Sequence, residues 1–265
     1  MGMSSASNAA AGNTEGAQSV RRAVAVLRAL AAGQDRGARA SEVALQCGLT
    51  RATAHRMLQV LVEEGLAERT PSPPRYVIGR EASLLGIARS SPLPIRTAAA
   101  PFLEKVCRET GDSTVLTLRS GTDSICIERL TGSYPIQVIG VSIGARLPLG
   151  VGVGGVVLLA FLPRGEREEL IARIAPRLAR HRTTVTVLRE RIRRAREQGH
   201  AFTDAGVIPG THVLAVPVLS PDGRPLAALS INAMANRLPA ARAKRLVPLL
   251  RQQADGIGAR WTALG

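Results

Sequence analysis

One stretch of basic and small polar residues carries the clearest chemistry in the sequence. Residues 51–65 read RATAHRMLQVLVEEG, and their helical spacing puts an apolar side against a polar one. Thr50 is expected to cap this helix and Gly65 to end it. The polar side would carry Arg51, Ala52, His55, Arg56 and Gln59. Arginine binds phosphate and guanine, and short side chains allow close approach, so this pattern predicts a helix that enters the major groove of DNA.

A second pattern involves Gly150, Gly152 and Gly155, which match the G-x-G-x-x-G spacing of dinucleotide-binding loops. That fingerprint should follow a buried strand, and an acidic residue should end a second strand about twenty residues later. Here Pro148 precedes the glycines and Glu168 falls in a predicted helix. A nucleotide-binding enzyme is therefore a disfavoured alternative.

The remaining reactive side chains form no catalytic or metal-binding pattern. The histidines are scattered, at His55, His181, His200 and His212. The cysteines Cys47, Cys107 and Cys126 are odd in number and far apart, which favours buried free thiols over disulfides or a zinc site. No metal, cofactor or enzymatic activity is expected.

Composition narrows the class of protein further. At 265 residues and 45% hydrophobic, the chain can form one or two domains with a sizeable core. Its longest apolar stretch, residues 147–162, contains four glycines and is too short for a membrane span of about 20 residues. Residues 1–18 have no secretory pattern and are expected to be a disordered tail, so we expect a cytoplasmic protein without a membrane partner.

The net charge of +15 permits DNA binding but does not locate it. Only Lys105 and Lys244 are lysines, so 33 of the 35 cationic residues are arginine, which indicates compositional bias. Residues 164–197 are more basic than residues 19–81. The arginines in the second half of that segment are predicted to lie on a solvated helix face and not to bind DNA; they are Arg189, Arg191, Arg193, Arg194 and Arg196.

The elements around residues 51–65 predict a winged helix-turn-helix domain over residues 19–81. A first helix over 19–33 has Ser19 as its expected cap and an apolar stripe that includes Val20, Val24 and Leu30. A second helix over 40–47 would end at Gly48, in the left-handed conformation usual after helices. Two strands, 66–70 and 76–79, flank a proline-rich turn and would form the wing.

The rest of the chain predicts a linker helix and an α+β domain. Residues 82–97 would form the linker helix, closed by prolines, and residues 98–265 the second domain. Helices are expected over 98–109, 164–174, 185–198 and 239–260, and strands over 113–120, 124–130, 136–141, 212–219 and 225–231. This irregular order favours a largely antiparallel sheet.

Five segments in this order resemble the IclR family of bacterial transcriptional regulators. They are SVRRAVAVLRALAAG, SEVALQCGLTRATAHRMLQVLVEEGLAER, YVIG, RLPLGVGVGGVVLLAFLP, and QGHAFTD with LAVPVLSPDGRPLAALSI. The resemblance covers almost everything from Ser19 onward and implies an N-terminal winged helix-turn-helix, a linker helix and a GAF-like α+β effector-binding domain. It implies a homodimer or dimer of dimers (a tetramer) that binds double-stranded operator DNA under control of a small-molecule effector, with repressor favoured over activator.

The resemblance also assigns site residues. The DNA-facing positions would be Arg51, Ala52, Thr53, His55 and Arg56. The effector-contacting positions would be Val153, Gly154, Asp204, Val213, Ser230 and Asn232. Small residues near 150–155 leave backbone N–H groups open to a carboxylate, and Ser230 and Asn232 share one strand face. The alternative is that these are packing glycines and solvent-facing polar residues.

The sequence departs from the family pattern around the effector positions. Gly150 and Val156 stand where relatives often have histidine and lysine, and Val213 stands where many have cysteine. The identity of the effector therefore stays open.

Two further alternatives concern assembly. Purely architectural DNA binding would explain the basic charge but not a second domain of roughly 170 residues. The apolar stripes of the first helix and of the linker helix, the latter with Leu84, Leu85, Ile87 and Ala88, could pair across a two-fold axis or be buried within one chain.

Overall fold

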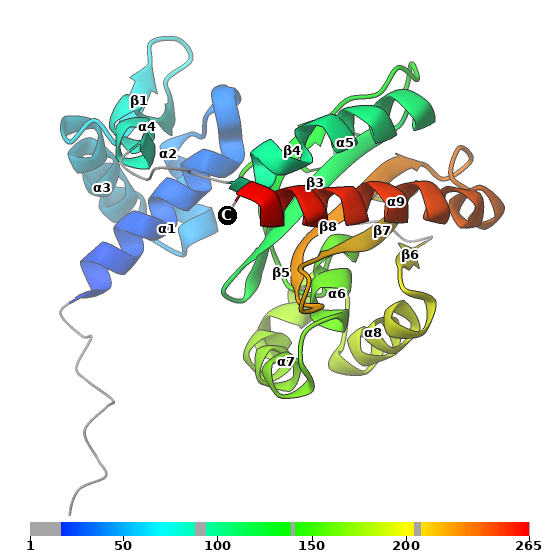
Figure 1. Ribbon diagram of the computed structural model, residues 1–265. Coiled ribbons are helices and arrows are strands. Elements are labelled where there is room, and N and C mark those ends of the chain that lie inside the picture. Colours follow the sequence, from blue (N-terminus) through cyan, green and yellow to red (C-terminus); the bar gives the residue numbers. More distant parts are fainter. Residues whose placement is uncertain (1–16, 88–93, 139–140, 204–207, 265) are drawn as a thin grey trace, which may run out of the picture. The chain divides into compact units, whose positions relative to one another are not determined.

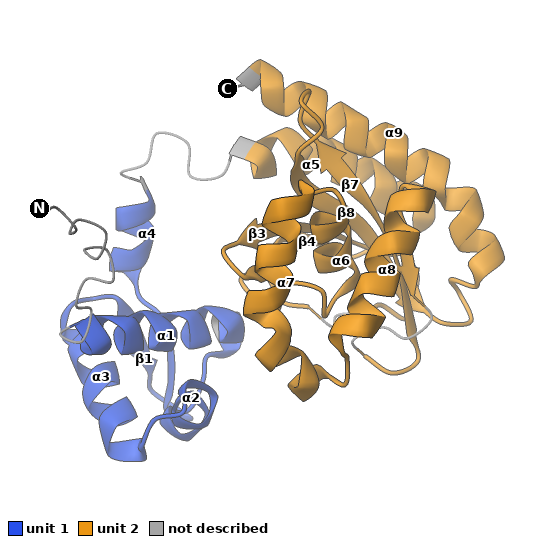
Figure 2. Cartoon of the chain, turned by 90° about the horizontal axis from the view of Figure 1, so that it is seen from below, with its two compact units in different colours: residues 1–88 blue, residues 89–265 orange. Residues whose placement is uncertain are grey.

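The computed structural model describes residues 17–87, 94–138, 141–203 and 208–264. The chain divides into two compact units, residues 1–88 (unit 1) and residues 89–265 (unit 2), coloured separately in Figure 2. The division falls inside the segment expected to link two domains. Nearly all of the tail predicted over residues 1–18 lies outside the described residues.

Unit 1 is a winged helix-turn-helix, as the sequence predicts. Its elements are α1 (Gln18–Gly33), a 3-10 turn (Gln34–Arg36), α2 (Ala40–Cys47), α3 (Arg51–Glu63), β1 (Ala67–Thr70), β2 (Arg75–Ile78) and α4 (Arg80–Ile87). The antiparallel β1–β2 hairpin is the wing, and Ala38 adds a bridge to Tyr76 through two backbone hydrogen bonds of 2.8 Å. Leu30, Val43, Leu58 and other apolar side chains of the three helices pack with Tyr76 in one core.

The first helix differs from the prediction at two points. Ser19 is not its cap, because the helix already begins at Gln18 and no side chain caps it. Val20 and Val24 are 63% and 38% exposed, since the buried positions of α1 come from its second half, around Val26 and Leu30.

In α4, which begins the predicted linker, Leu84 and its neighbour Leu85 are exposed. The side chains of Ile87 and Ala88 lie outside the described residues.

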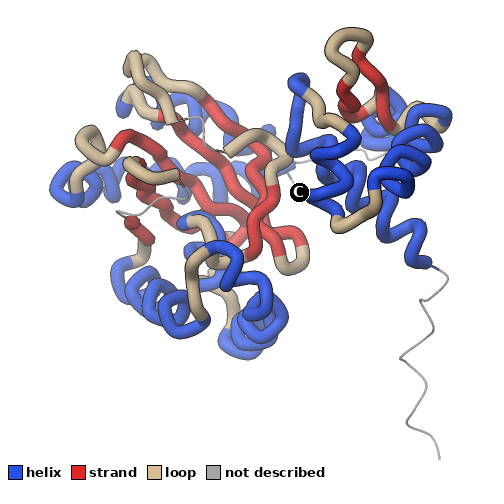
Figure 3. The backbone as a smooth tube through the Cα atoms, turned by 180° about the vertical axis from the view of Figure 1, so that it is seen from behind, coloured by secondary structure: helices blue, strands red, loops and turns tan. Residues whose placement is uncertain are grey.

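Unit 2 is an α+β unit built on a six-stranded antiparallel sheet, with strand order β5-β4-β3-β8-β7-β6. Figure 3 shows these strands in red. The strands are β3 (Ser113–Ser120), β4 (Asp123–Leu130), β5 (Arg146–Pro148), β6 (Ala201–Thr203), β7 (Thr211–Leu219) and β8 (Pro225–Met234). The helices are α5 (Pro94–Thr110), α6 (Val153–Ala160), α7 (Arg164–Leu178), α8 (Val185–Gln198) and α9 (Ala240–Leu264), with a 3-10 turn at Ala179–His181.

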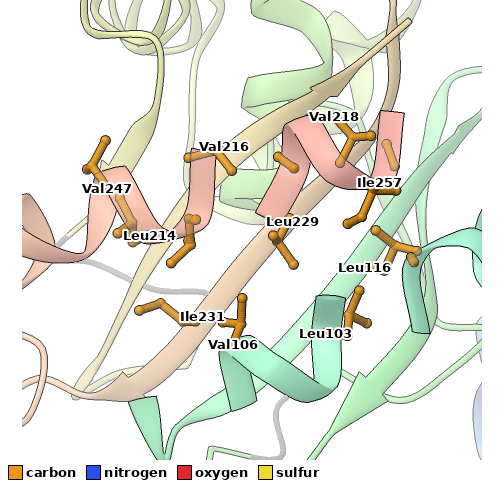
Figure 4. Close-up of a cluster of buried hydrophobic side chains, with 14 of the residues drawn as sticks. Leu103, Val106, Leu116, Leu214, Val216, Val218, Leu229, Ile231, Val247 and Ile257 are labelled. Carbon is orange, nitrogen blue, oxygen red and sulfur yellow. The ribbon is translucent and has the colours of Figure 1, made fainter. Parts of the chain in front are cut away.

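Helices cover both faces of this sheet. In Figure 1, α5 and α9 lie on one face, and α6, α7 and α8 lie on the other. Figure 4 shows the core under α5 and α9, where Leu103 and Ile257 pack on Leu116 and on alternate residues of β7 and β8. The intervening residues, such as Ala215 and Ala228, point to the second core under α6.

Four elements differ from the sequence prediction. Described residues in the segment 136–141 form no strand; the Gln137 side chain instead donates to Tyr134 O (2.6 Å) and Gly111 O (3.0 Å) and holds a loop. The two edge strands of the sheet, β5 and β6, were not predicted. Helix α6 was not predicted either, because its glycines lower helix propensity, and it is supported by burial of nearly its whole length.

Candidate functional site

Helix α3 presents the predicted DNA-facing residues on its open side. Arg51, Ala52, His55 and Arg56 are exposed, whereas the opposite side of the helix is buried at Leu58 and two further positions. Thr50 caps the helix as predicted, accepting from the Thr53 backbone N–H at 3.2 Å. The Thr50 and Thr53 hydroxyls lie 2.9 Å apart, so Thr53 also stabilises the helix start.

The start of α3 carries no acidic side chain that would repel a polyanion such as DNA. The unpaired N–H groups at a helix start also favour a phosphate. Gly48 has φ 64° and ψ 34°, the left-handed conformation that lets the chain turn sharply between α2 and α3. Arg75 of the wing donates to Gly37 O at 3.1 Å and so fixes the hairpin, while Arg69 stays exposed.

Unit 2 contains a cavity of about 400 Å³ between the sheet and helices α6 and α8. We call it the sheet cavity. Its lining includes Val153, Gly154, Val213, Ser230 and Asn232, which are five of the six predicted effector positions. The sixth, Asp204, lies outside the described residues. The volume is within the range of small-molecule sites.

The start of α6 forms one wall of the sheet cavity. Gly152 precedes the helix, and the first hydrogen bond of the helix runs from the Val156 N–H to Gly152 O, at 3.0 Å. A Cβ at Gly154 would lie 3.1 Å from Thr117 Oγ1, so this turn packs directly on β3. Gly150 has φ 87°, in the left-handed region that favours glycine. The glycines therefore serve a turn and close packing, and they leave the first-turn N–H groups beside the cavity.

Two polar side chains of β8 line the cavity from the sheet. Asn232 is 7% exposed, and its Oδ1 has no hydrogen-bond partner among the described residues. Ser230 Oγ donates to Val115 O at 3.5 Å. Cys126 of β4 also lines the cavity, and burial raises the pKa of its thiol to about 11. Because Asn232 lines the cavity, this unpartnered buried acceptor lies next to the space where a ligand could supply a donor.

Helix α8 contributes cations that sequence reasoning placed on a solvated face. Arg191 is half-buried and lines the sheet cavity, which corrects that prediction for this residue, whereas Arg194 lines the cavity mouth and stays exposed as predicted. The spacing of three residues between Arg191 and the buried Leu188 was the available signal. Arg194 pairs with Glu190 at 2.6 Å, and hydrogen bonds from Arg193 and Arg194 hold the pKa of Glu190 near 2. Arg191 has neither an ion pair nor a hydrogen bond with any described residue.

Two further properties of the residues that the structure describes concern metal binding and the membrane. These residues contain no group of three or more His, Cys, Asp or Glu residues arranged to hold a metal ion. No helix among them is long and apolar enough to cross a membrane.

Comparison with known proteins matches both units. The model of the IclR helix-turn-helix domain matches residues 19–71, and that of the bacterial transcriptional regulator IclR C-terminal domain matches residues 88–259. The regulator XynR of Escherichia coli (strain K12) is 29% identical over 232 residues, which cover 83% of this chain and 88% of XynR. The transcriptional repressor IclR of the same strain is 25% identical over 202 residues, 75% of this chain and 73% of the repressor.

A solved structure extends the likeness to the fold of nearly the whole chain. The IclR homologue of Microbacterium hydrocarbonoxydans in complex with 4-hydroxybenzoate has a TM-score of 0.68 and 27% identity, covering 93% of this chain and all of that one. The family and these relatives are transcriptional regulators and not enzymes. With family models matching both of its units in order, the chain belongs to the IclR family of bacterial transcriptional regulators.

Proposed function

We propose that this chain is a repressor whose affinity for double-stranded operator DNA changes when a small carboxylate binds in the sheet cavity. The observation that carries the proposal is the composition of that cavity. It combines the start of a helix, the unneutralised Arg191 and the unpartnered Asn232 Oδ1 with apolar side chains such as Val213.

The proposed DNA contacts come from α3. Arg56 would bind a phosphate or a guanine edge, and Ala52 would allow the helix to approach the base pairs closely. Arg51, Thr53 and His55 complete the proposed set. Two observations support this placement. The four side chains other than Thr53 are exposed, and the first turn of α3 contains no acidic residue.

The proposed effector carries a carboxylate and a hydrogen-bond donor. Its carboxylate would meet Arg191 and the N–H groups of Val153 and Gly154, since a helix start and a guanidinium both favour an anion. Its donor would pair with Asn232 Oδ1, beside Ser230. Val213 and apolar neighbours would hold the body of the ligand, and Asp204 is retained as a proposed contact. The relative bound to 4-hydroxybenzoate makes that compound the first probe.

The regulatory step requires that the two binding events be coupled. A coupling free energy of about 1–3 kcal/mol would change operator affinity by roughly 5- to 150-fold. We further propose a homodimer or a dimer of dimers, which would present two α3 helices to one operator. The exposed apolar side chains Val20, Leu84 and Leu85 supply surface for such an association.

The first test measures binding to the DNA upstream of the chain's own gene, against a scrambled duplex, from about 50 to 200 mM salt. A preference of about 10³-fold that persists at the higher salt supports an operator-specific regulator. Loss of all preference on this duplex and on genomic fragments would overturn it.

The second test measures 4-hydroxybenzoate, and then other small carboxylates, by calorimetry and in the operator assay. Arg191→Gln should weaken binding by about tenfold, because a charge-assisted hydrogen bond is lost. Arg189→Gln is the matched control, since Arg189 is exposed on the same helix and does not line the cavity. A carboxylate that binds without changing operator affinity would refute the regulatory step alone.

A further inference from the structure

A second cavity, of about 410 Å³, lies at the opposite end of α6 from the sheet cavity. It is lined by the last residue of α6 and the segment that follows, and by four arginines. We call it the arginine pocket; its charged residues are Arg164, Arg167, Arg196, Arg224 and Asp222.

The central cation of this pocket is Arg167, which is only 9% exposed. Its Nη1 donates to Leu162 O at 3.1 Å and to Ala160 O at 3.4 Å, and Arg196 Nη1 also donates to Ala160 O at 3.4 Å. These bonds use one nitrogen of each guanidinium, although each guanidinium has five N–H donors. Burial, and next the charge of Arg196, lower the pKa of Arg167.

Within the described residues the positive charge of the pocket is balanced only in part, by Glu166, by Asp222 and by the charge of Glu168 near Arg167. Among these residues, Arg164, Arg167 and Arg196 form no ion pair with a carboxylate, whereas Arg224 pairs with Glu166 at 2.7 Å. Asp222 contributes one negative charge, and its carboxylate accepts a hydrogen bond from Ser220.

The end of α6 adds only a partial negative charge, of about half a unit. Three guanidinium groups therefore line a pocket with one carboxylate, the last carbonyl of α6 (Ala160 O) and the carbonyl of Leu162. A buried cation without a carboxylate partner is costly, and an anion in the pocket would lower that cost.

We propose that the arginine pocket binds a small, doubly charged oxyanion of the phosphate or sulfate type. The planar guanidinium fork matches two oxygens of such an anion, and Arg164, Arg167 and Arg196 bring three guanidinium groups to the lining of the pocket. The depth of Arg167 favours a free anion over a DNA backbone, whose phosphates would meet the exposed Arg164 and Arg196 first.

The test is calorimetric titration of the full chain with inorganic phosphate at constant ionic strength, with sulfate as a competitor. We expect saturable binding in the millimolar range or tighter, at one site per chain, at up to ~20 mM phosphate. Arg196→Gln should weaken binding about tenfold, because it removes a charge-assisted contact. Arg193→Gln is the matched control: it removes the same charge from the same exposed side of α8, outside the pocket.

Arg164→Gln is the second variant, since Arg164 is exposed and makes no hydrogen bond or ion pair with the described residues. A thermal melt shows which variants are folded. Weaker binding in either folded pocket variant, with Arg193→Gln unchanged, supports the site. No saturable binding, an equal loss in Arg193→Gln, or displacement of phosphate by a short DNA duplex would overturn it.

Discussion

The sharpest expectation concerns Asn232→Leu, a substitution that should stabilise the protein while weakening its binding of the effector. Asn232 lies on the central strand β8, with its backbone in register with Ser113 and Val213. Its side chain is 7% exposed, and Oδ1 lacks a partner among the described residues. Leucine has a similar branched shape, leaves the backbone pairing intact and fits strands better than asparagine.

The magnitude follows from the desolvation of that oxygen. An unsatisfied buried acceptor costs about 1–3 kcal/mol, and removing it should recover part of this free energy of unfolding. For a unit of this size, each kcal/mol corresponds to about 2–4 °C in melting temperature. The same oxygen is proposed to accept a hydrogen bond from the effector, so its loss should weaken binding about tenfold.

The assay combines thermal melts of the ligand-free protein with calorimetric titration of the effector. Ser230→Ala is the matched control, two residues away on the same face, because Ser230 Oγ already donates to Val115 O. Ser230→Ala should therefore leave stability unchanged or lower it. Destabilisation by Asn232→Leu would refute the argument from the unsatisfied acceptor, and unchanged affinity would remove Asn232 from the ligand site.

Three other expectations rest on separate observations. Arg56→Ala should weaken operator binding by about 1–3 kcal/mol without changing the melting temperature, and Arg56→Lys should recover part of it; equal affinity in a titration would contradict the placement of α3. Asp112→Ala should lower the free energy of unfolding in urea by about 3–5 kcal/mol, because Asp112 is 2% exposed and pairs with Arg242 at 2.7 Å and with Arg237. A loss below about 1 kcal/mol would count against this buried network. Cys126, with a pKa of about 11, should be alkylated about a hundredfold more slowly at pH 8 than a thiol of ordinary pKa 9.0, and its rate should rise about tenfold per pH unit, because burial favours the neutral thiol. A rate that levels off near pH 9 would show that burial does not hold the thiol neutral.

The sequence by itself determined most of the elements and the exposed polar side of α3. Those features depend on local physics: Thr50 accepts from an N–H three residues later, and Gly48 adopts a conformation that other residues avoid. The side chains of β7 and β8 alternate between the two faces of the sheet, which likewise follows from the two-residue period of a strand. In α6 the glycines lower the helix propensity, whereas burial of the segment stabilises a helix. The sequence alone therefore did not predict this helix.

The proposed effector positions came from a family resemblance, and their spacing in the sequence could not have shown that they lie together. Gly154 and Asn232 line one cavity although they lie far apart in sequence, because α6 packs on β3 and β3 pairs with β8. The same geometry decided which arginines face solvent and which face a cavity. Arg191 and Arg193 are neighbours on a helix that looks uniformly charged in sequence, yet only Arg191 lines the cavity. Side-chain environment depends on what packs against a helix, and contacts between distant segments exist only in the folded chain.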